Sequence, residues 1–185
     1  IVKVDAAGEG LVITDGRNRV SGIVTADVSA SNGVIHAIDK VLLPADKTIV
    51  DTAVSNADFS ILVEAATAAG LVDTLNSAGP FTVFAPTNAA FAALLTELGI
   101  TKAQLLADTA LLTQVLTYHV IPARVLKAEI TPDTPIATVQ TDTLRIDSSF
   151  VITDQRNRTA SIVAADILAS NGVVHVIDKV ILPAP

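Results

Sequence analysis

The sequence of 185 residues contains no cysteine, methionine or tryptophan, and its aromatic residues are limited to one tyrosine and five phenylalanines. The absence of cysteine excludes disulfide frameworks, thiolate metal sites and cysteine nucleophiles. Half of the residues are nonetheless hydrophobic. We therefore expect a folded chain whose core is built mainly from aliphatic side chains.

Basic residues are also few, because 12 Lys and Arg stand against 19 Asp and Glu and give a net charge of −7. Nucleic-acid binding depends on a surplus of basic residues, so we expect no nucleic-acid partner. The longest apolar stretches are interrupted by charged or turn residues, as Glu64 interrupts residues 61–72. They fall short of the roughly 20 residues that a membrane-spanning helix needs, so no membrane-spanning segment is expected.

An internal repeat relates residues 12–45 to residues 151–184 at a constant offset of 139, with 24 of 34 positions identical. Such a dense match indicates two copies of one structural unit. Residues 47–140 have no counterpart in the chain. We therefore predict that residues 1–46 are the C-terminal portion of a preceding domain, and that residues 47–185 are a complete domain. Together with the start at Ile1 and the absence of a signal peptide, this predicts a processed product or a fragment.

Each copy of the repeat has the pattern of β-strands. Residues 151–153 and 161–163 are rich in β-branched side chains and flank the polar loop 154–158, as in a β-hairpin. The run from Val173 to Leu182 is apolar on both faces, which predicts a strand deep inside a sheet. Pro183 is expected to end it.

The middle of the chain is helical in pattern. Apolar residues recur at steps of three and four from Phe59 to Ala69, and Gly70 is expected to close that helix. Residues 81–84 form a strand pattern, and further helices are expected at residues 103–106 and 110–118. Helices followed mostly by strands predict an α+β fold with antiparallel sheets rather than a doubly wound parallel fold.

Four segments can be compared with a known family. Residues 81–91 (FTVFAPTNAAF) and 170–183 (SNGVVHVIDKVILP) resemble the two signatures of fasciclin (FAS1) domains, Tyr118-His119 resembles the family's tyrosine–histidine motif, and residues 48–53 resemble its opening helix. All four occur in the expected order. Residues 1–46 carry only the second signature.

The resemblance implies a FAS1 fold, which is a wedge-like antiparallel β-sandwich with several packed helices, preceded here by a partial second copy. It also implies tandem domains in secreted or cell-surface proteins that mediate cell adhesion and matrix assembly, with no enzymatic activity and no cofactor. The expected partners are other copies of the chain or neighbouring FAS1 domains, with a cell-surface receptor or an acidic polysaccharide as further candidates.

Two interpretations of Tyr118 and His119 stay open. The resemblance implies that the motif contacts a receptor, whereas the residues themselves also fit a tyrosine ring that closes the core and a histidine bonded to backbone. His175, which repeats as His36, is expected to be structural in the same way. A hydrolase site at Ser170, His175 and Asp178 is not expected, because His175 and Asp178 have opposite parity along one strand.

Arg156 and Arg158 repeat as Arg17 and Arg19 and form a basic spot on an acidic chain. They could bind the carboxylates of an acidic glycan or of a neighbouring subunit, or they could simply be the solvated tip of a hairpin. An N-glycosylation sequon at Asn157 is too common by chance to support a prediction.

The strands of residues 1–46 lack the helices against which they would pack, so aliphatic faces and strand edges are expected to be exposed. Either the chain is cut from a longer tandem array, or a partner completes the partial domain by strand addition. The sequence thus favours a non-enzymatic extracellular adhesion or matrix protein that could self-assemble into a filament. The alternative is a module that binds a glycan or a small apolar ligand.

Overall fold

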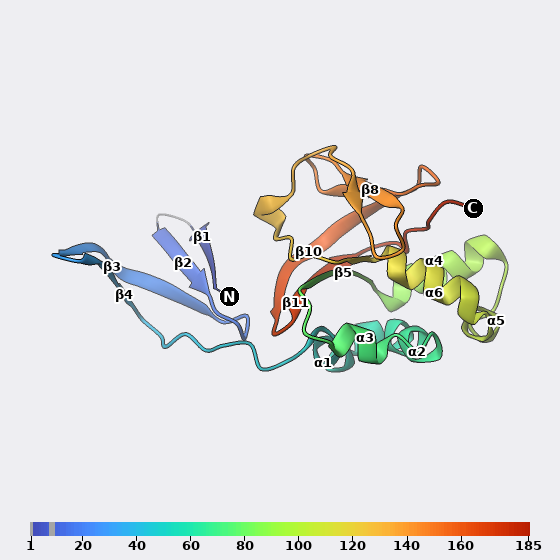
Figure 1. Ribbon diagram of the computed structural model, residues 1–185, viewed down its shortest axis with the longest axis horizontal. Coiled ribbons are helices and arrows are strands. Elements are labelled where there is room, and N and C mark those ends of the chain that lie inside the picture. Colours follow the sequence, from blue (N-terminus) through green and yellow to red (C-terminus); the bar gives the residue numbers. More distant parts are fainter. Residues whose placement is uncertain (1, 8–9) are drawn as a thin grey trace. The chain divides into compact units, whose positions relative to one another are not determined.

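The structure is a computed structural model that describes residues 2–7 and 10–185. The chain divides into two compact units. The N-terminal unit consists of residues 1–47 with 168–170, and the C-terminal unit consists of residues 48–167 and 171–185. Figure 1 shows the described elements with their labels.

The N-terminal unit is an antiparallel sheet in the order β1-β2-β3-β4. Its strands are β1 (Lys3–Ala7), β2 (Gly10–Thr14), β3 (Val20–Ala30) and β4 (Gly33–Ile38). A turn that begins at Asp15 joins β2 to β3. The Asp15 carboxylate accepts hydrogen bonds from the backbone amides of Arg17 and Arg19. β4 is an edge strand of this sheet.

The C-terminal unit contains a sheet in the order β6-β5-β11-β10-β9-β8-β7. Its strands are β5 (Phe81–Pro86), β6 (Val120–Ile121), β7 (Ile136–Ala137), β8 (Thr143–Ile146), β9 (Val151–Thr153), β10 (Thr159–Ala169) and β11 (Gly172–Ile177). The predicted hairpin is confirmed, because β9 pairs antiparallel with β10 across the loop 154–158.

The helices of this unit lie before β5 and between β5 and β6. They are α1 (Ile49–Val54), the 3-10 helix η1 (Ala57–Phe59), α2 (Ser60–Ala68), α3 (Val72–Asn76), α4 (Asn88–Leu98), α5 (Lys102–Ala107) and α6 (Thr109–Tyr118), with the 3-10 helix η2 (Lys127–Glu129) after β6. In Figure 1 these α-helices lie together on one side of the unit, whereas β8 and its neighbouring loops lie on the other.

Local sequence explains where these helices begin and end. Thr48, Thr87 and Thr101 precede α1, α4 and α5, and each hydroxyl accepts the backbone amide three residues later, as side-chain caps do. Gly70 and Gly99 follow α2 and α4 with φ values of 67° and 65°, a conformation that glycine adopts without a steric penalty. The predicted end of the second helix at Gly70 is therefore confirmed.

The α+β fold with a sheet and several helices is confirmed, but the expectation of antiparallel sheets is wrong at one pair. β11 pairs with β5 in parallel, from Gly172 opposite Phe81 to Ile177 opposite Pro86. Parallel neighbours need a long crossover connection, and the helices α4 to α6 form part of it. The order of helices and strands along the chain did not reveal that β5 would enter the sheet beside its last strand.

One strand is shorter than its sequence pattern predicts. β11 ends at Ile177 rather than Leu182. Residues 180–182 are buried although they form no strand, so their apolar pattern reflects burial alone.

All six residues of β11 are buried, as predicted for a strand inside the sheet. On one side, Ile177 of β11 belongs to a cluster of buried side chains that also contains Phe84, Tyr118, Ile121, Ile130, Leu144, Ile146, Ile152, Ala160 and Ile181. On the other side, Val174 lies with the apolar side chains of α1, α2 and β5. The predicted, mainly aliphatic core is confirmed, and its buried aromatic residues are Phe59, Phe84, Phe91 and Tyr118.

Candidate functional site

Tyr118 is the last residue of α6 and is completely buried. Its hydroxyl donates a hydrogen bond of 2.9 Å to the backbone carbonyl of Thr143 at the start of β8. Burial raises the pKa of the phenol well above its ordinary value, and the negative charge of Asp154 acts in the same direction. Tyr118 therefore links α6 to β8 through a hydrogen bond from its neutral hydroxyl.

His119 follows directly and is also buried. Its Nδ1 lies 2.6 Å from the carbonyl oxygen of Val115, and its Nε2 accepts the backbone amide of Ile181 at 3.2 Å. These partners require a neutral ring with the proton on Nδ1. Burial lowers the pKa of His119 to about 4. Both ring nitrogens are thus occupied, and the histidine joins α6 to the segment after β11.

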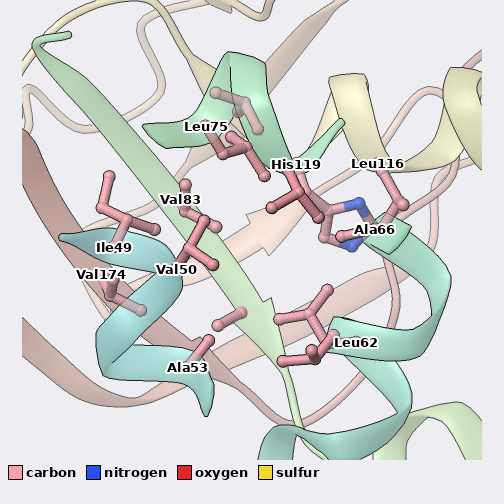
Figure 2. A pocket seen from close by; sticks show the side chains of 14 residues that line it. Ile49, Val50, Ala53, Leu62, Ala66, Leu75, Val83, Leu116, His119 and Val174 are labelled. Atoms are coloured by element: carbon pink, nitrogen blue, oxygen red, sulfur yellow. The ribbon is translucent and has the colours of Figure 1, made fainter. Parts of the chain in front are cut away.

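One face of the His119 ring borders an apolar cavity of about 50 Å³ under the helices. Figure 2 shows that side chains from α1, α2, β5 and β11 surround it. Sites for small organic ligands are usually at least ~300 Å³. The cavity therefore has no room for such a ligand unless the helices separate, and it gives no support to the hypothesis of a small apolar ligand.

His175 lies in β11 with both ring nitrogens bonded to backbone. Nδ1 accepts the amide of Asp166 at 3.1 Å, and Nε2 lies 2.9 Å from the carbonyl oxygen of Val125. The first of these bonds recurs in the N-terminal unit, where His36 Nδ1 accepts the amide of Asp27 at 3.2 Å. Asp166 and Asp27 have positive φ values of 59° and 57° inside β10 and β3. In each unit the histidine thus binds the backbone of the neighbouring strand at the residue with this conformation.

The hydrolase arrangement, which we did not expect, is not formed. Asp178 lies beyond the end of β11, and its carboxylate accepts the backbone amide of Ser161 at 2.7 Å. The ring of His175 is directed to Asp166 and Val125 instead. Within residues 2–7 and 10–185, no group of three or more His, Asp or Glu is arranged to hold a metal ion.

Arg156 and Arg158 lie in the turn between β9 and β10, and their side chains bind other parts of the same unit. Arg156 Nε donates to the carbonyl of Pro183 at 3.0 Å. Arg158 Nη2 lies 2.7 Å from Glu97 Oε2 of α4, with 22% of its side chain exposed. Acidic glycan binding by this pair stays a prediction, and such a ligand would compete with Glu97.

Sequence reasoning did not identify two buried polar side chains that organise the unit. Asp154 accepts the amides of Arg156 and Arg158 within its turn and the amide of Leu182 from the C-terminal segment. Asn171 accepts the amide of Ile49 at 2.9 Å. The signal was available, because both residues are identical in the two copies of the repeat, where they correspond to Asp15 and Asn32.

Asn171 links three elements through one side chain. Its Oδ1 accepts the first amide of α1, and its Nδ2 donates to the carbonyls of Leu75 and Ser77 at the end of α3, at 2.7 and 2.9 Å. The turn between β10 and β11 therefore fixes the position of both helices. The neighbouring Gly172 lets β5 approach, since a Cβ there would lie 2.0 Å from the carbonyl oxygen of Phe81.

The N-terminal unit presents a different surface around the corresponding strand, which we term the β4 surface (Asn32, Gly33, Val34, Ile35 and Val41). The side chains of Val34 and Ile35 are 57% and 58% exposed, and Val41 is 76% exposed. Val34 and Ile35 are consecutive in β4 and therefore expose apolar side chains on both faces of the strand. Exposed apolar surface of this kind is typical of an interaction site. The predicted exposure of aliphatic side chains in residues 1–46 is confirmed.

No helix among the described residues is long and apolar enough to cross a membrane. The β4 surface differs from the sites around Tyr118, His119 and His175, whose polar groups are all satisfied inside the C-terminal unit.

Comparisons with known proteins agree with the fold and the motifs. The Fasciclin domain family matches residues 2–44 and 57–183. Protein sll1483 of Synechocystis sp. is 44% identical over 139 residues, which cover 74% of this chain and 73% of that protein. The transforming growth factor-beta-induced protein ig-h3 of Sus scrofa is 37% identical over 164 residues, which cover 88% of this chain but only 23% of that protein.

A solved structure has the same fold. It is a FAS1 domain pair from the insect cell adhesion molecule Fasciclin I, which matches with a TM-score of 0.69 at 21% identity and covers 98% of this chain and 66% of that one. The family match extends over most of the described residues and includes both copies of the repeat. The chain therefore belongs to the fasciclin domain family.

Proposed function

We propose that this protein is a non-enzymatic adhesion or surface-assembly protein that acts outside the cell, secreted or held at the cell surface, by binding other FAS1-type polypeptides, including copies of itself. Membership of the fasciclin family supports the proposal, as does the fold shared with a domain pair of a cell adhesion molecule. Repeated association of this kind would build a filament or a matrix.

The observation that carries the proposal is the contrast between equivalent residues in the two units. Val34 and Ile35 are 57% and 58% exposed, whereas their counterparts Val173 and Val174 are 0% and 3% exposed. At ~25 cal/mol per Å² of apolar surface, such side chains gain substantial free energy when a partner covers them. The β4 surface is thus suited to association.

The proposed domain organisation is a C-terminal portion of one FAS1 domain in residues 1–46, followed by a complete FAS1 domain in residues 47–185. The family matches residues in both segments. The two segments also repeat the same hydrogen bonds, such as the amide of Leu43 to Asp15 at 3.0 Å and the amide of Leu182 to Asp154 at 2.9 Å.

The absence of enzymatic activity is part of the proposal. A general base needs a free nitrogen or oxygen within reach of a substrate. His119 and His175 have both ring nitrogens bonded to backbone and are 1% and 0% exposed. Their geometry supports a structural role.

Sedimentation velocity of the whole chain over a hundredfold range of concentration tests the proposal. We expect the average mass to rise with concentration, and to stay at that of a monomer when Val34→Lys and Ile35→Lys are combined. Val163→Lys is the matched control, because Val163 is 60% exposed on β10 of the C-terminal unit and should not affect association. A chain that stays monomeric throughout and binds no other FAS1 domain would contradict the proposal.

A further inference from the structure

We propose that a cavity in the C-terminal unit binds one uronate residue of an acidic polysaccharide, and that Arg158 and Lys179 bind the carboxylate of this sugar. The inference goes beyond the proposed function, because the ligand is a sugar and the site includes no residue of the β4 surface. It also restricts the site predicted for the pair Arg156 and Arg158 to one of the two arginines.

The cavity is lined by α4, by the hairpin turn with the start of β10, and by the segment that follows β11. Its volume is about 330 Å³, and sites for small organic ligands usually measure ~300–1,000 Å³. Apolar side chains of α4 line part of the wall, and Asn157 and Thr159 add polar groups that can bind sugar hydroxyls. The size and the lining therefore fit a sugar residue.

The cavity has a surplus of positive charge, although the whole chain has a net charge of −7. The charged residues that line it are Arg158, Lys179 and Glu97, so two positive charges stand against one negative charge. A guanidinium group pairs well with a planar carboxylate, and Arg158 already holds the carboxylate of Glu97 through Nη2 at 2.7 Å. One further carboxylate would neutralise the remaining positive charge.

Arg158 has a donor that no group in the structure uses. Its Nη1 is buried and has no hydrogen-bond partner among the described residues. The equivalent arginine of the other copy, Arg19, instead binds the carboxylate of Asp15 through Nε and Nη2 at 2.9 and 2.7 Å. A buried donor without an acceptor costs free energy. Because the side chain of Arg158 lines the cavity, rotation of its torsions can bring Nη1 to a carboxylate bound there.

Lys179 supplies a second positive charge whose donors are unused. Its counterpart Lys40 donates to the carbonyl of Val20 at 2.8 Å, whereas Lys179 makes no hydrogen bond or ion pair within residues 2–7 and 10–185. Asn157 shows the same contrast, since the side chain of its counterpart Asn18 is hydrogen-bonded inside the N-terminal unit and that of Asn157 is not bonded to the described part of the chain. The groups around the cavity are thus available to a ligand.

Arg156, the other arginine of the turn, is not part of this site. Its Nε donates to the carbonyl of Pro183 at 3.0 Å, and its side chain lines a separate, mainly apolar cavity between α4, α5 and α6. The two arginines therefore line different cavities, and Lys179 lines only that of Arg158. This difference makes Arg156 a matched control for Arg158.

Isothermal titration calorimetry of the whole chain with a trimer of galacturonate tests the inference. We expect saturable binding that Arg158→Gln and Lys179→Gln each weaken at least ~10-fold, because each removes a positive charge from the carboxylate. Arg156→Gln should change the affinity less than ~2-fold. The fully methyl-esterified trimer has the same sugars without the charge and should bind at least ~10-fold more weakly. Circular dichroism checks that each variant is folded.

The inference would be overturned by the absence of binding, or by equal binding of the charged and the esterified trimer. Binding that Lys179→Gln leaves unchanged, or that Arg156→Gln weakens as much as Arg158→Gln does, would also overturn it, because the sugar would then occupy another place. Displacement of the trimer by an equal concentration of inorganic phosphate would show that the site prefers a different anion. These results leave the proposed function untouched, since sedimentation tests it through Val34 and Ile35.

Discussion

The carboxylate of Asp154 accepts the backbone amide of Leu182 at 2.9 Å, across 28 residues of chain. Asp15 and Leu43 are related in the same way at 3.0 Å in the N-terminal unit. Burial is the largest single influence on Asp15 and acts to raise its pKa, but hydrogen bonds from the Leu43 amide, the Arg19 side chain and the amides of Arg19 and Arg17 together hold that pKa well below its ordinary value. In each copy of the repeat, a buried aspartate in the hairpin turn thus binds the backbone near the end of the copy.

Asp154→Ala should lower the free energy of unfolding of the C-terminal unit by about 3 kcal/mol, because three backbone amides lose a buried charged acceptor. Urea unfolding followed by circular dichroism measures this. Asp73→Ala is the control, since Asp73 is exposed on α3 and substitutions of this kind usually change stability by less than about 0.5 kcal/mol. Equal effects of the two substitutions would contradict the role of Asp154.

The lowered pKa of His119 predicts how the free energy of unfolding changes at acidic pH. Its pKa is about 4 in the folded chain against 6.5 ordinarily, so between these values only the unfolded chain binds the proton. The free energy of unfolding should therefore fall as the pH falls from 6.5 to 4, by up to about 1.4 kcal/mol per pH unit from this group. His119→Gln should reduce that slope, as measured by urea unfolding at several pH values, and an unchanged slope would refute the assignment.

The raised pKa of Tyr118 predicts how the free energy of unfolding changes at alkaline pH. Burial raises its pKa above the ordinary 10.0, so above that pH the unfolded chain releases a proton that the folded chain retains, and stability falls as the pH rises. Because Tyr118 is the only tyrosine, the ultraviolet absorbance of tyrosinate reports on it alone. We expect tyrosinate to form together with the loss of circular dichroism. Ionisation before unfolding would show that the phenol is accessible.

Acidic polysaccharide binding can be tested through the ion pair of Arg158 and Glu97, whose charged atoms lie 2.7 Å apart. If the guanidinium groups of the turn bind such a ligand, Arg158→Ala should weaken binding severalfold, and Glu97→Gln should strengthen it by removing a competing carboxylate. Surface plasmon resonance on immobilised polysaccharide measures both. Binding that neither substitution changes would exclude this turn as the site.

Much of the fold could be predicted from local patterns. The β-branched runs on either side of the polar loop 154–158 predicted the β9–β10 hairpin. The apolar periodicity up to Gly70 predicted α2, because both patterns depend on neighbouring residues. The parallel pairing of β5 with β11 could not be predicted, since it joins segments about 90 residues apart and their apolar sequences fit either direction.

The candidate sites were predicted less completely. The sequence indicated that His119 and His175 could be satisfied by backbone, but it did not reveal which atoms they contact, because Ile181 and Val125 are distant in sequence. Asp154 and Asn171 could have been found as polar residues identical in both copies. Their structural role depends on hydrogen bonds from the amides of Leu182 and Ile49, which are distant in the sequence.

Hydrogen exchange at the backbone amides of β4 and β11 tests the central claim most directly. In the dilute chain alone, we expect the amides of Val34–Ile38 to exchange much faster than those of Val173–Ile177, because β4 is an edge strand and β11 lies inside its sheet. A hundredfold rise in the concentration of the chain should slow exchange in β4 at least ~10-fold, because association covers this strand. Equal protection of the two strands in the dilute chain, or β4 exchange that does not change with concentration, would contradict the account.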